Sequence, residues 1–341
     1  MPRLCLVRPN RSYRIDERIG HGSFSTVFAA TNVYHDKRVA IKIIRNDQEC
    51  FDAGLREIRI HSLIRQHDPE GLRHIVRMVD GFYSREHLFI VTELLNNSLF
   101  AHYMHLDTLG GHARAEFYNA ATLGTLSAQM LDALDFLKGI GVTHCDVKSA
   151  NICIIDSATK LFKLIDFGSA SLRYDVQTSY LQSRWYRAPE VILGCEHGPK
   201  IDMWSFGCLL AELVVGFCPF QFPSSELVLG AQMAACGPFP PWMLMDSPLA
   251  DIFFSATGHV YEMDPSTLAA GVYLLRNAPD SSLSSMIDAR ANPTIFGEPL
   301  TMFKLFLNSL LTIDPNIRPT AADAIQHAWL APYRMLVPHA A

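Results

Sequence analysis

The sequence predicts an α+β protein of two lobes, a small β-rich lobe followed by a larger, mainly helical one. The chain has 341 residues, which is long enough for two substantial cores. Short stretches rich in β-forming residues lie in the first hundred residues, among them Val39–Ile44 and Leu88–Thr92. Apolar residues at helical spacing follow in the second part, as between Leu123 and Leu137.

Composition narrows the class of protein. Hydrophobic residues make up 49% and charged residues 18% of the chain, which is typical of a globular protein. The formal net charge of −5, without a basic block, gives no reason to expect nucleic-acid binding. No apolar run is long enough to span a bilayer, and residues 1–10 do not form a signal peptide. The eight scattered cysteines indicate thiols in a reducing compartment.

A glycine-rich loop follows the first predicted strand, Tyr13–Ile19. Its order G-H-G-S-F-S-T-V suits a phosphate loop, whose candidate binding residues are Gly20, Gly22, Ser25 and Val27. A dinucleotide-binding turn would open a helix, but strand-forming residues follow here, so we expect a flap between two strands. Ser25 stands where a third glycine is usual, which reduces backbone freedom.

The next elements offer a lysine and a partner for it. In the predicted strand Val39–Ile44, Ala40 and Lys42 share one face. A helix is expected over Asp52–Gln66, with an apolar face made of Leu55, Ile58 and Leu63, and it carries Glu57, a carboxylate that could serve as the partner. The alternatives are a snorkelling lysine and a solvated glutamate, because arginines flank Glu57.

The centre of the chain runs from Thr143 to Gly168 and reads T-H-C-D-V-K-S-A-N, followed by a strand and D-F-G. Asp146 could accept a proton from an attacking hydroxyl, and Lys148 adds a positive charge two residues on. Asn151 and Asp166 offer the hard oxygen ligands that suit Mg²⁺ together with substrate phosphates.

This order of motifs resembles the eukaryotic protein kinase family over nearly the whole chain. The resemblance implies a bilobal protein kinase fold, with an extension at 1–12, a small lobe at 13–95, a large lobe at 96–335 and a tail at 336–341. It implies ATP and Mg²⁺, with Lys42 on the α/β-phosphates, Glu57 as its partner, and Asn151 and Asp166 as metal ligands. It also places Thr92, Glu93 and Leu95 at the hinge that binds adenine.

The segment from Ser179 to Glu190 is similar to the corresponding segment of the dual-specificity tyrosine-regulated kinases (DYRK). These kinases are a branch of the cyclin-dependent, MAP, glycogen-synthase and CDC-like (CMGC) group. Tyr180 aligns with the tyrosine that this branch autophosphorylates, and Arg184 and Arg187 are expected to bind the phosphate on Tyr180. Cys145 replaces the usual catalytic-loop arginine, as in this branch, and we interpret it as a small buried thiol.

The large lobe carries further matches. Glu190 and Arg318 correspond to the pair that braces this lobe in the family. The nearly all-apolar helix Ile201–Gly216 is expected to be central, with Asp202 accepting backbone hydrogen bonds from the catalytic loop. Residues 221–300 cover a CMGC-type insert, and Ala321–Trp329 is predicted to form a closing helix.

The functional prediction is an ATP-dependent Ser/Thr protein kinase with Asp146 and Lys148 as catalytic residues. By family analogy Arg187 favours proline after the phosphosite, and Tyr180 is a candidate for autophosphorylation. One alternative is a CDC-like or homeodomain-interacting-like CMGC kinase; another, which the four intact residues Lys42, Asp146, Asn151 and Asp166 disfavour, is a pseudokinase scaffold. We expect protein substrates, no nucleic-acid or membrane partner, a monomer, and a cytoplasmic or nuclear location.

Overall fold

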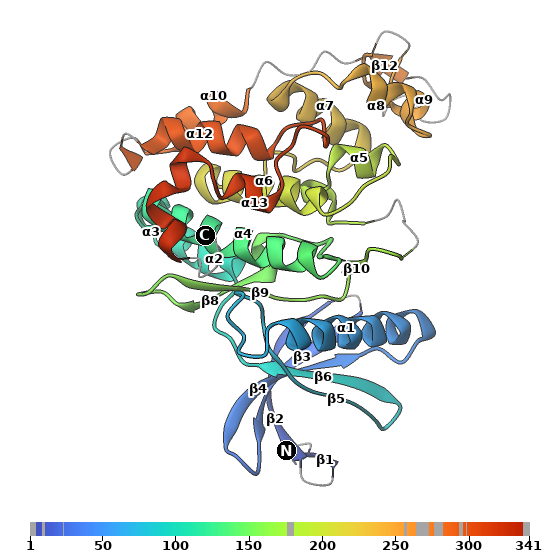
Figure 1. Cartoon of the computed structure of the whole chain (residues 1–341), viewed down its shortest axis with the longest axis vertical. Helices are drawn as coiled ribbons and strands as arrows, with labels where there is room; N and C mark the ends of the chain where they lie inside the picture. The colour runs from blue at the N-terminus through green and yellow to red at the C-terminus, as the bar shows by residue number, and fades with distance from the viewer. Residues whose placement is uncertain are drawn as a thin grey trace.

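The computed structural model describes residues 5–8, 11–22, 24–175, 181–255, 258–263, 273–275, 282–292, 296–297 and 299–336. The predicted fold class is confirmed, because a β-rich lobe is followed by a larger helical one (Figure 1). Within the described part of the chain, no helix has the length and apolar character needed to cross a bilayer.

The small lobe is built on an antiparallel six-stranded sheet in the order β1-β2-β3-β4-β6-β5. Its strands are β1 (Cys5–Arg8), β2 (Arg11–His21), β3 (Ser25–Asn32), β4 (Lys37–Ile44), β5 (Met78–Ser84) and β6 (His87–Glu93). The register pairs Val27 of β3 with Lys42 of β4, and Ala40 of β4 with Thr92 of β6. The strand that follows the glycine loop, the strand that carries Lys42 and the strand that leads to the hinge are therefore neighbours.

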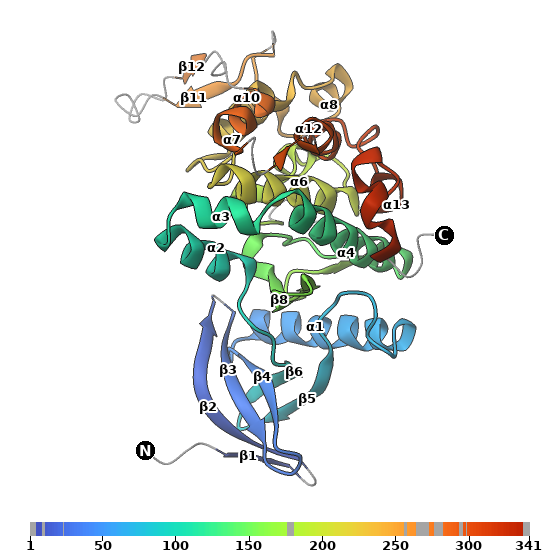
Figure 2. The ribbon, with the colours of Figure 1, turned by 90° about the vertical axis from the view of Figure 1, so that its left-hand side faces the viewer.

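Helix α1 (Gln48–His67) lies between the sheet and the helical lobe, as Figures 1 and 2 both show. Asp47 directly precedes it, and its carboxylate accepts the backbone N–H of Cys50 at 2.9 Å and so caps the first turn. The helix approaches the sheet closely at Gly54, where a Cβ atom would lie 2.8 Å from Leu88. The predicted apolar face was wrong in one respect, because burying Gly54 turns the neighbouring Leu55 outward, where it is 45% exposed.

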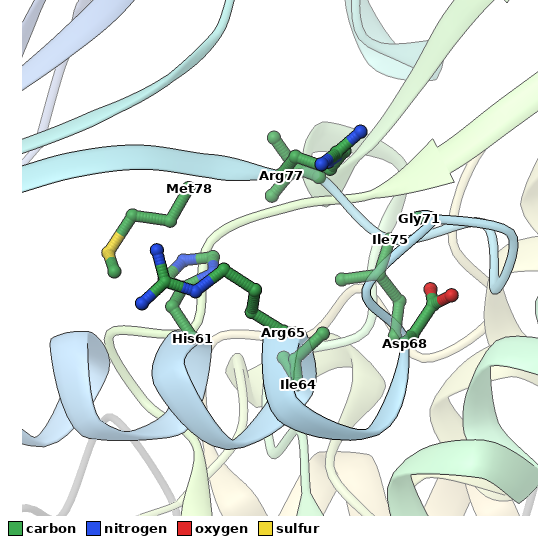
Figure 3. A pocket seen from close by; sticks show the side chains of 9 residues that line it. His61, Ile64, Arg65, Asp68, Gly71, Ile75, Arg77 and Met78 are labelled. Atoms are coloured by element: carbon green, nitrogen blue, oxygen red, sulfur yellow. The ribbon is translucent and has the colours of Figure 1, made fainter.

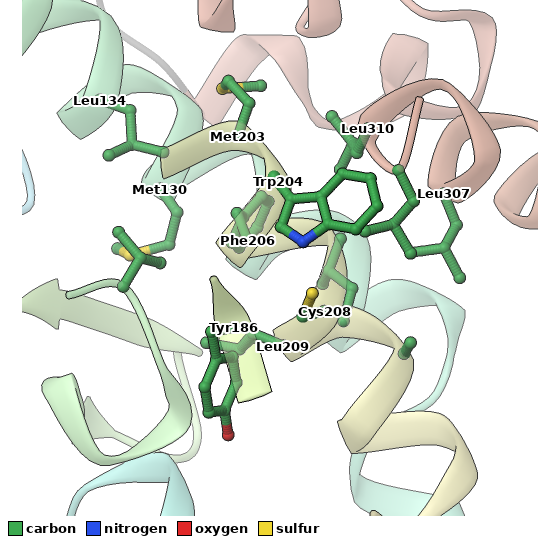
Figure 4. Close-up of a cluster of buried hydrophobic side chains, with 14 of the residues drawn as sticks. Met130, Leu134, Tyr186, Met203, Trp204, Phe206, Cys208, Leu209, Leu307 and Leu310 are labelled. Carbon is green, nitrogen blue, oxygen red and sulfur yellow. The ribbon is translucent and has the colours of Figure 1, made fainter. Parts of the chain in front are cut away.

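The large lobe consists mainly of helices around a buried central helix, α6 (Lys200–Val215). The others are α2 (Leu99–Thr108), α3 (Gly111–Phe117), α4 (Ala120–Gly139), α5 (Pro189–Ile192), α7 (Ser225–Cys236), α8 (Pro241–Met245), α9 (Ala250–Phe253), α10 (Leu283–Arg290), α12 (Pro299–Leu310) and α13 (Ala321–Ala324). Trp204 of α6 is fully buried and packs with Leu307 and Leu310 of α12 in the core (Figure 4). This confirms the prediction of a central helix that is apolar almost all round.

Short strand pairs and 3₁₀ turns complete the described elements. The strands are β7 (Val142–Thr143) with β10 (Ser171–Leu172), β8 (Ile152–Asp156) with β9 (Leu161–Leu164), and β11 (Tyr261–Met263) with β12 (Tyr273–Leu275). The 3₁₀ turns are η1 (Ser149–Asn151), η2 (Arg184–Tyr186) and η4 (Ala328–Leu336).

The predicted closing helix Ala321–Trp329 was wrong, because it divides into α13 and η4. A capping box of Thr320 and Asp323 starts α13, but the next hydrogen bonds span only three residues, as from Leu330 N–H to His327 C=O at 2.9 Å. The tighter winding seats Trp329 against the rings of Phe303 and Phe306 of α12.

Candidate active site

The predicted lysine and glutamate meet between β4 and α1. Lys42 Nζ lies 2.8 Å from Glu57 Oε2 and 3.0 Å from Oε1. Both groups are largely withdrawn from water, with side chains 15% and 4% exposed. Burial opposes the charged ammonium, but the carboxylates of Glu57 and Asp166 outweigh this and raise the pKa of Lys42. Burial also raises the pKa of Glu57, and the two short contacts with Lys42 oppose that rise.

Asp166 brings the large lobe to the same lysine. Its Oδ1 lies 2.7 Å from Lys42 Nζ, and its backbone has a left-handed φ of +63°. Burial alone would raise the pKa of Asp166, but Lys42 overrides this and lowers it to about 2. A Cβ atom on Gly168 would lie 3.2 Å from both Asp166 Oδ1 and Lys42 Nζ, so glycine leaves room for this ion pair.

Asp146 is the centre of a second polar cluster. Its Oδ2 accepts from Lys148 Nζ at 2.7 Å and from Asn151 Nδ2 at 2.9 Å, while its Oδ1 accepts from Ser183 Oγ at 2.7 Å. Lys148 Nζ also reaches Ser183 Oγ at 2.9 Å. The carboxylate is therefore oriented by three partners, two from its own loop and one from the segment before α5.

The loop that carries Asp146 is fastened to the first turn of α6. Asp202 is buried, and its two oxygens accept the backbone N–H groups of His144 at 2.7 Å and Cys145 at 2.9 Å. Cys145 has a φ of +63°, so these bonds hold a strained backbone position. Burial, with Asp202 nearby, raises the pKa of the Cys145 thiol well above its usual value, as expected for an unreactive thiol.

Two histidines pack against Phe167, the residue after Asp166. The ring centroids of His61 on α1 and of His144 lie 5.1 and 5.0 Å from that of Phe167, both edge to face. His61 also lines a cavity of about 20 Å³ together with Arg65, Arg77 and Met78 (Figure 3). Burial, reinforced by Lys42, lowers the pKa of His61 to about 4.

The predicted phosphate-loop and hinge residues lie on β2, β3, β4 and β6 of the small-lobe sheet and on the chain that follows β2 and β6. Gly20 is the last residue but one of β2, Gly22 lies in the turn, and Ser25 and Val27 lie among the first, turn-proximal residues of β3. Gly22 N–H donates to the carbonyl of Ser25 at 2.9 Å and closes the turn. Ala40 on β4 faces Thr92 on β6.

The hinge residue Glu93 ends β6 and has two partners. Its Oε1 lies 2.5 Å from Lys163 Nζ on β9 and accepts the backbone N–H of Arg77 at 2.8 Å. Leu95 follows it outside the strand and packs against the main core.

The two predicted phosphate-binding arginines have backbone partners. Arg187 is buried and donates to the carbonyls of Leu181 at 2.7 Å and Gln182 at 2.9 Å. Arg184 donates to the carbonyl of Pro223. Tyr180 lies outside the described residues.

Three side chains join these clusters that the sequence did not single out for such roles. Ser183 bonds Asp146, His61 packs on Phe167, and Lys163 bonds Glu93. Ser183 lies within the segment already noted as family-specific, so its place in that motif was an available signal. His61 and Lys163 make their contacts across elements, and no local pattern marks them.

Comparison with known proteins agrees with this geometry. A family model described as the protein kinase domain matches residues 13–330. The chain belongs to the protein kinase family. Among curated relatives it is 33% identical over 321 residues to Serine/threonine-protein kinase ppk5 of Schizosaccharomyces pombe, covering 93% of this chain and 36% of that protein.

The predicted resemblance to the DYRK branch is confirmed. Dual specificity tyrosine-phosphorylation-regulated kinase mbk-2 of Caenorhabditis elegans is 32% identical, over 93% of this chain and 38% of its own length. Dual specificity tyrosine-phosphorylation-regulated kinase 4 of Homo sapiens is 31% identical, over 96% of this chain and 59% of its own length. The chain thus spans between 36% and 59% of these three curated relatives.

Proposed function

We propose that this chain transfers the γ-phosphate of ATP to serine or threonine hydroxyls of protein substrates. The observation that carries the proposal is the pairing of Lys42 with both Glu57 and Asp166, of which Asp166 follows Asp146 and its cluster by twenty residues. One cluster supplies positive charge for phosphates, and the other supplies an oriented carboxylate for a hydroxyl. Membership of the protein kinase family supports the same reaction.

Asp146 and Lys148 would act on the reacting groups themselves. Asp146 accepts the proton of the substrate hydroxyl as its oxygen bonds to the γ-phosphorus. The bond between that phosphorus and the β–γ bridging oxygen breaks, and ADP leaves with the bonding electrons. Lys148 offsets negative charge on the transferred group, so that positioning and charge neutralisation supply most of the catalysis.

Nucleotide binding would fall to the small lobe. Lys42 contacts the α- and β-phosphates, and the backbone of the loop from Gly20 to Val27 covers them. The hinge segment Glu93–Leu95 offers backbone groups to adenine, with Thr92 beside the inner pocket. The ion pair of Glu93 with Lys163 supports this role because it ties the hinge to a strand of the large lobe.

Asp166 and Asn151 fit the binding of Mg²⁺ along with the nucleotide. The backbone N–H of Ile165, the residue before Asp166, donates to the carbonyl of Asn151 at 2.9 Å, which supports this assignment because the two chain segments are adjacent. Within the described ranges, no group of three or more His, Cys, Asp or Glu side chains could hold a metal alone. A magnesium ion bound here would share its ligands with substrate phosphates. When bound, Mg²⁺ neutralises charge on those phosphates.

Two finer features extend the proposal. Arg187 favours substrates with proline directly after the phosphosite, by analogy with the family. Tyr180 undergoes autophosphorylation, as the relatives named dual-specificity kinases suggest. Mass spectrometry of tryptic peptides from bacterially expressed protein tests the second feature, and absence of phosphate on Tyr180 would count against it.

The test of the main proposal is the variant Asp146→Asn. It removes the proton acceptor but keeps the size of the side chain, so turnover should fall by about 10²–10⁴-fold. ATP affinity, measured by calorimetry, should stay within about twofold, because Lys42 and Asp166 are untouched. Asp288→Asn is a matched control on α10, where the carboxylate is 54% exposed and pairs with Lys304. Near-normal turnover of the Asp146 variant would exclude this residue from the mechanism.

A further inference from the structure

An open pocket of about 560 Å³ lies between α1, the end of α4 and the turn that follows β10. Four residues of α1 line it, and their spacing of three, four and seven positions puts them on one face of the helix. They are Arg59, Ser62, Leu63 and Gln66. The rest of its described lining comes from residues 139–141 and 172–174, which belong to neither cluster of the candidate active site.

The pocket combines apolar surface with two cations. Leu63, Ile140 and Leu172 are half-buried and pack against the main core. Arg59 and Arg173 are exposed, and within the described part of the chain no carboxylate pairs with either guanidinium. Two like charges that line one pocket repel each other unless an anion lies between them. The pocket therefore suits a group that joins negative charge to an apolar body.

Tyr174, which also lines this pocket, is held at the corner of a closed turn. The backbone N–H of Asp175 donates to the carbonyl of Leu172 at 2.9 Å, and the N–H of Leu172 donates to the Asp175 carboxylate at 2.7 Å. The N–H of Arg173 donates to the carbonyl of Gly141 at 2.9 Å, which fastens the turn to the loop after α4. Tyr174 is nevertheless 91% exposed, so its side chain is open to a modifying enzyme.

The charges around the turn favour an anion. Besides Arg59 and Arg173, Arg56 lies one turn earlier on α1, and Lys138 lies in the last turn of α4. The carboxylate of Asp175 opposes an anion, but it already accepts the N–H of the turn. The carbonyl groups that end α4 also oppose one, with a partial charge of about half an electron against several full positive charges.

We propose that Tyr174 is a phosphorylation site and that its phosphate binds Arg59 and Arg173 in this pocket. A phosphate brings close to two negative charges and three acceptor oxygens, which suit two guanidinium groups. The contact would join the turn after β10 to α1, the helix that carries Glu57, the partner of Lys42. Here this chain is itself the substrate, at a residue six positions before Tyr180.

The modification is an ordinary phosphoryl transfer from ATP by a tyrosine kinase. The hydroxyl oxygen of Tyr174 bonds to the γ-phosphorus, the bond from that phosphorus to the β–γ bridging oxygen breaks, and ADP leaves with the bonding electrons. The hydroxyl proton passes to the base of the kinase.

The test of the binding site uses the full chain with Tyr174 in its phosphorylated form, incorporated as phosphotyrosine during translation. Its phosphate is followed by ³¹P NMR as the pH is varied. The second pKa of a free phosphotyrosine is about 6, and two guanidinium groups in contact should lower it to about 5, because they favour the dianion. Arg59→Gln and Arg173→Gln should each return the value toward about 6. A value of about 6 in the chain with both arginines, or a low value that both variants keep, would overturn the proposal.

The matched control carries the phosphate on Tyr34 instead, in the turn between β3 and β4, where the side chain is 59% exposed. The second pKa of that phosphate should not respond to Arg59→Gln or Arg173→Gln, and thermal melting checks that each variant is folded. A response as large as that at Tyr174 would reveal a general effect of charge and would count against the pocket.

Mass spectrometry shows whether Tyr174 is modified and by which enzyme. Tryptic peptides that end at Arg184 contain both Tyr174 and Tyr180, and their fragment ions separate the two sites. Phosphate on Tyr174 after bacterial expression, abolished by Asp146→Asn, assigns the transfer to this chain. Phosphate that appears only with Mg-ATP and an added tyrosine kinase assigns it to another enzyme and supports the site without any kinase activity of this chain. If neither treatment modifies Tyr174, the modification site is wrong.

Discussion

At the scale of single residues, the candidate site depends on groups whose charge is set by their neighbours. Lys42 stays cationic in a buried place because two carboxylates lie within 3 Å of it. For His61, on the same helix as Glu57, the surroundings favour the neutral form instead. It is 3% exposed, it packs on Phe167, and burial disfavours its protonated form. Protonation of His61 should therefore weaken the folded state.

Replacing His61 with leucine should make the protein less sensitive to mild acid. The pKa of His61 is lowered from about 6.5 to about 4 on folding, so its neutral form is favoured in the folded state. The stability this represents is complete above pH 6.5 and is lost as the pH falls toward 4. The loss is about 3 kcal/mol over that range. His61→Leu should keep most of its stability as the pH falls. The measurement is the free energy of urea unfolding at pH 7.5, 6 and 5.

The matched control is His35→Leu, since His35 is exposed in the turn between β3 and β4. It should leave the pH dependence unchanged. Some dependence should persist in both variants, because burial also lowers the pKa of His74. Equal pH slopes for His61→Leu and the unsubstituted chain would show that His61 does not titrate on unfolding.

Residues within contiguous motifs were the predictable ones. Asp146, Lys148 and Asn151 fall within six residues, so their spacing alone brings them together. Glu57 was found because it falls where the helix glutamate of the protein kinase family belongs. His61 lies one turn further along the same helix, but its partner Phe167 is more than a hundred residues away in sequence. Only packing of the two lobes makes that contact, and a single sequence does not contain it.

At the scale of elements, the first turn of α6 determines the shape of the catalytic loop. Asp202 replaces missing backbone partners for two successive N–H groups, those of His144 and Cys145. The positive φ of Cys145 is compatible with this pairing and turns the chain before Asp146. The element that orients the proposed catalytic residue is thus a buried helix that contributes no group to the reaction.

Asp202→Ala should therefore lower both activity and stability. It leaves two buried N–H groups without acceptors, each costing about 1–3 kcal/mol, so we expect a loss of about 2–6 kcal/mol in the free energy of unfolding. Turnover should fall at least tenfold, because Asp146 is no longer held at the correct place. Asp202→Asn keeps one acceptor oxygen and should be intermediate. Urea denaturation and steady-state kinetics measure the two effects, and a fully active alanine variant would refute the argument.

Elements were predictable where one periodicity dominated. Val39–Ile44 and Leu88–Thr92 became β4 and β6, because apolar and β-branched residues suit a pleated, half-buried surface. The face of α1 was misjudged at Leu55, since the close approach at Gly54 and the buried Glu57 set the orientation of the helix. Ala321–Trp329 divided because its aromatic contacts with α12, which lie outside the segment, favour tighter winding.

At the scale of the whole molecule, ionic and backbone contacts bridge the two lobes. Lys42 of β4 pairs with Asp166, and Glu93 at the end of β6 pairs with Lys163 of β9. The backbone N–H of Val76 also donates to the carbonyl of Leu164 at 3.0 Å. These contacts fix the sheet of the small lobe against the strands that lead to Asp166, so nucleotide and metal groups would meet in one geometry.

A fully buried arginine, Arg318, braces the large lobe. Arg318 has a fully buried side chain and binds both oxygens of Glu190, at 2.6 and 2.9 Å. Its other N–H groups donate to backbone carbonyls, those of Thr312, Lys200 and Ile313. The contacts join segments more than a hundred residues apart in sequence, so this pair should be coupled to the stability of the entire lobe.

Arg318→Met should lower the free energy of unfolding by about 3–5 kcal/mol, because it leaves the Glu190 carboxylate buried without a cation. Glu190→Leu should lower the free energy of unfolding by a similar amount, because it leaves the Arg318 guanidinium buried without an anion. The double variant should be less destabilised than the sum of the two, by at least about 1 kcal/mol, since neither charge is then left alone. Urea unfolding of the four proteins closes the cycle. If the two losses simply add, the pair is not a coupled unit, and the backbone carbonyls around Arg318 carry its effect instead.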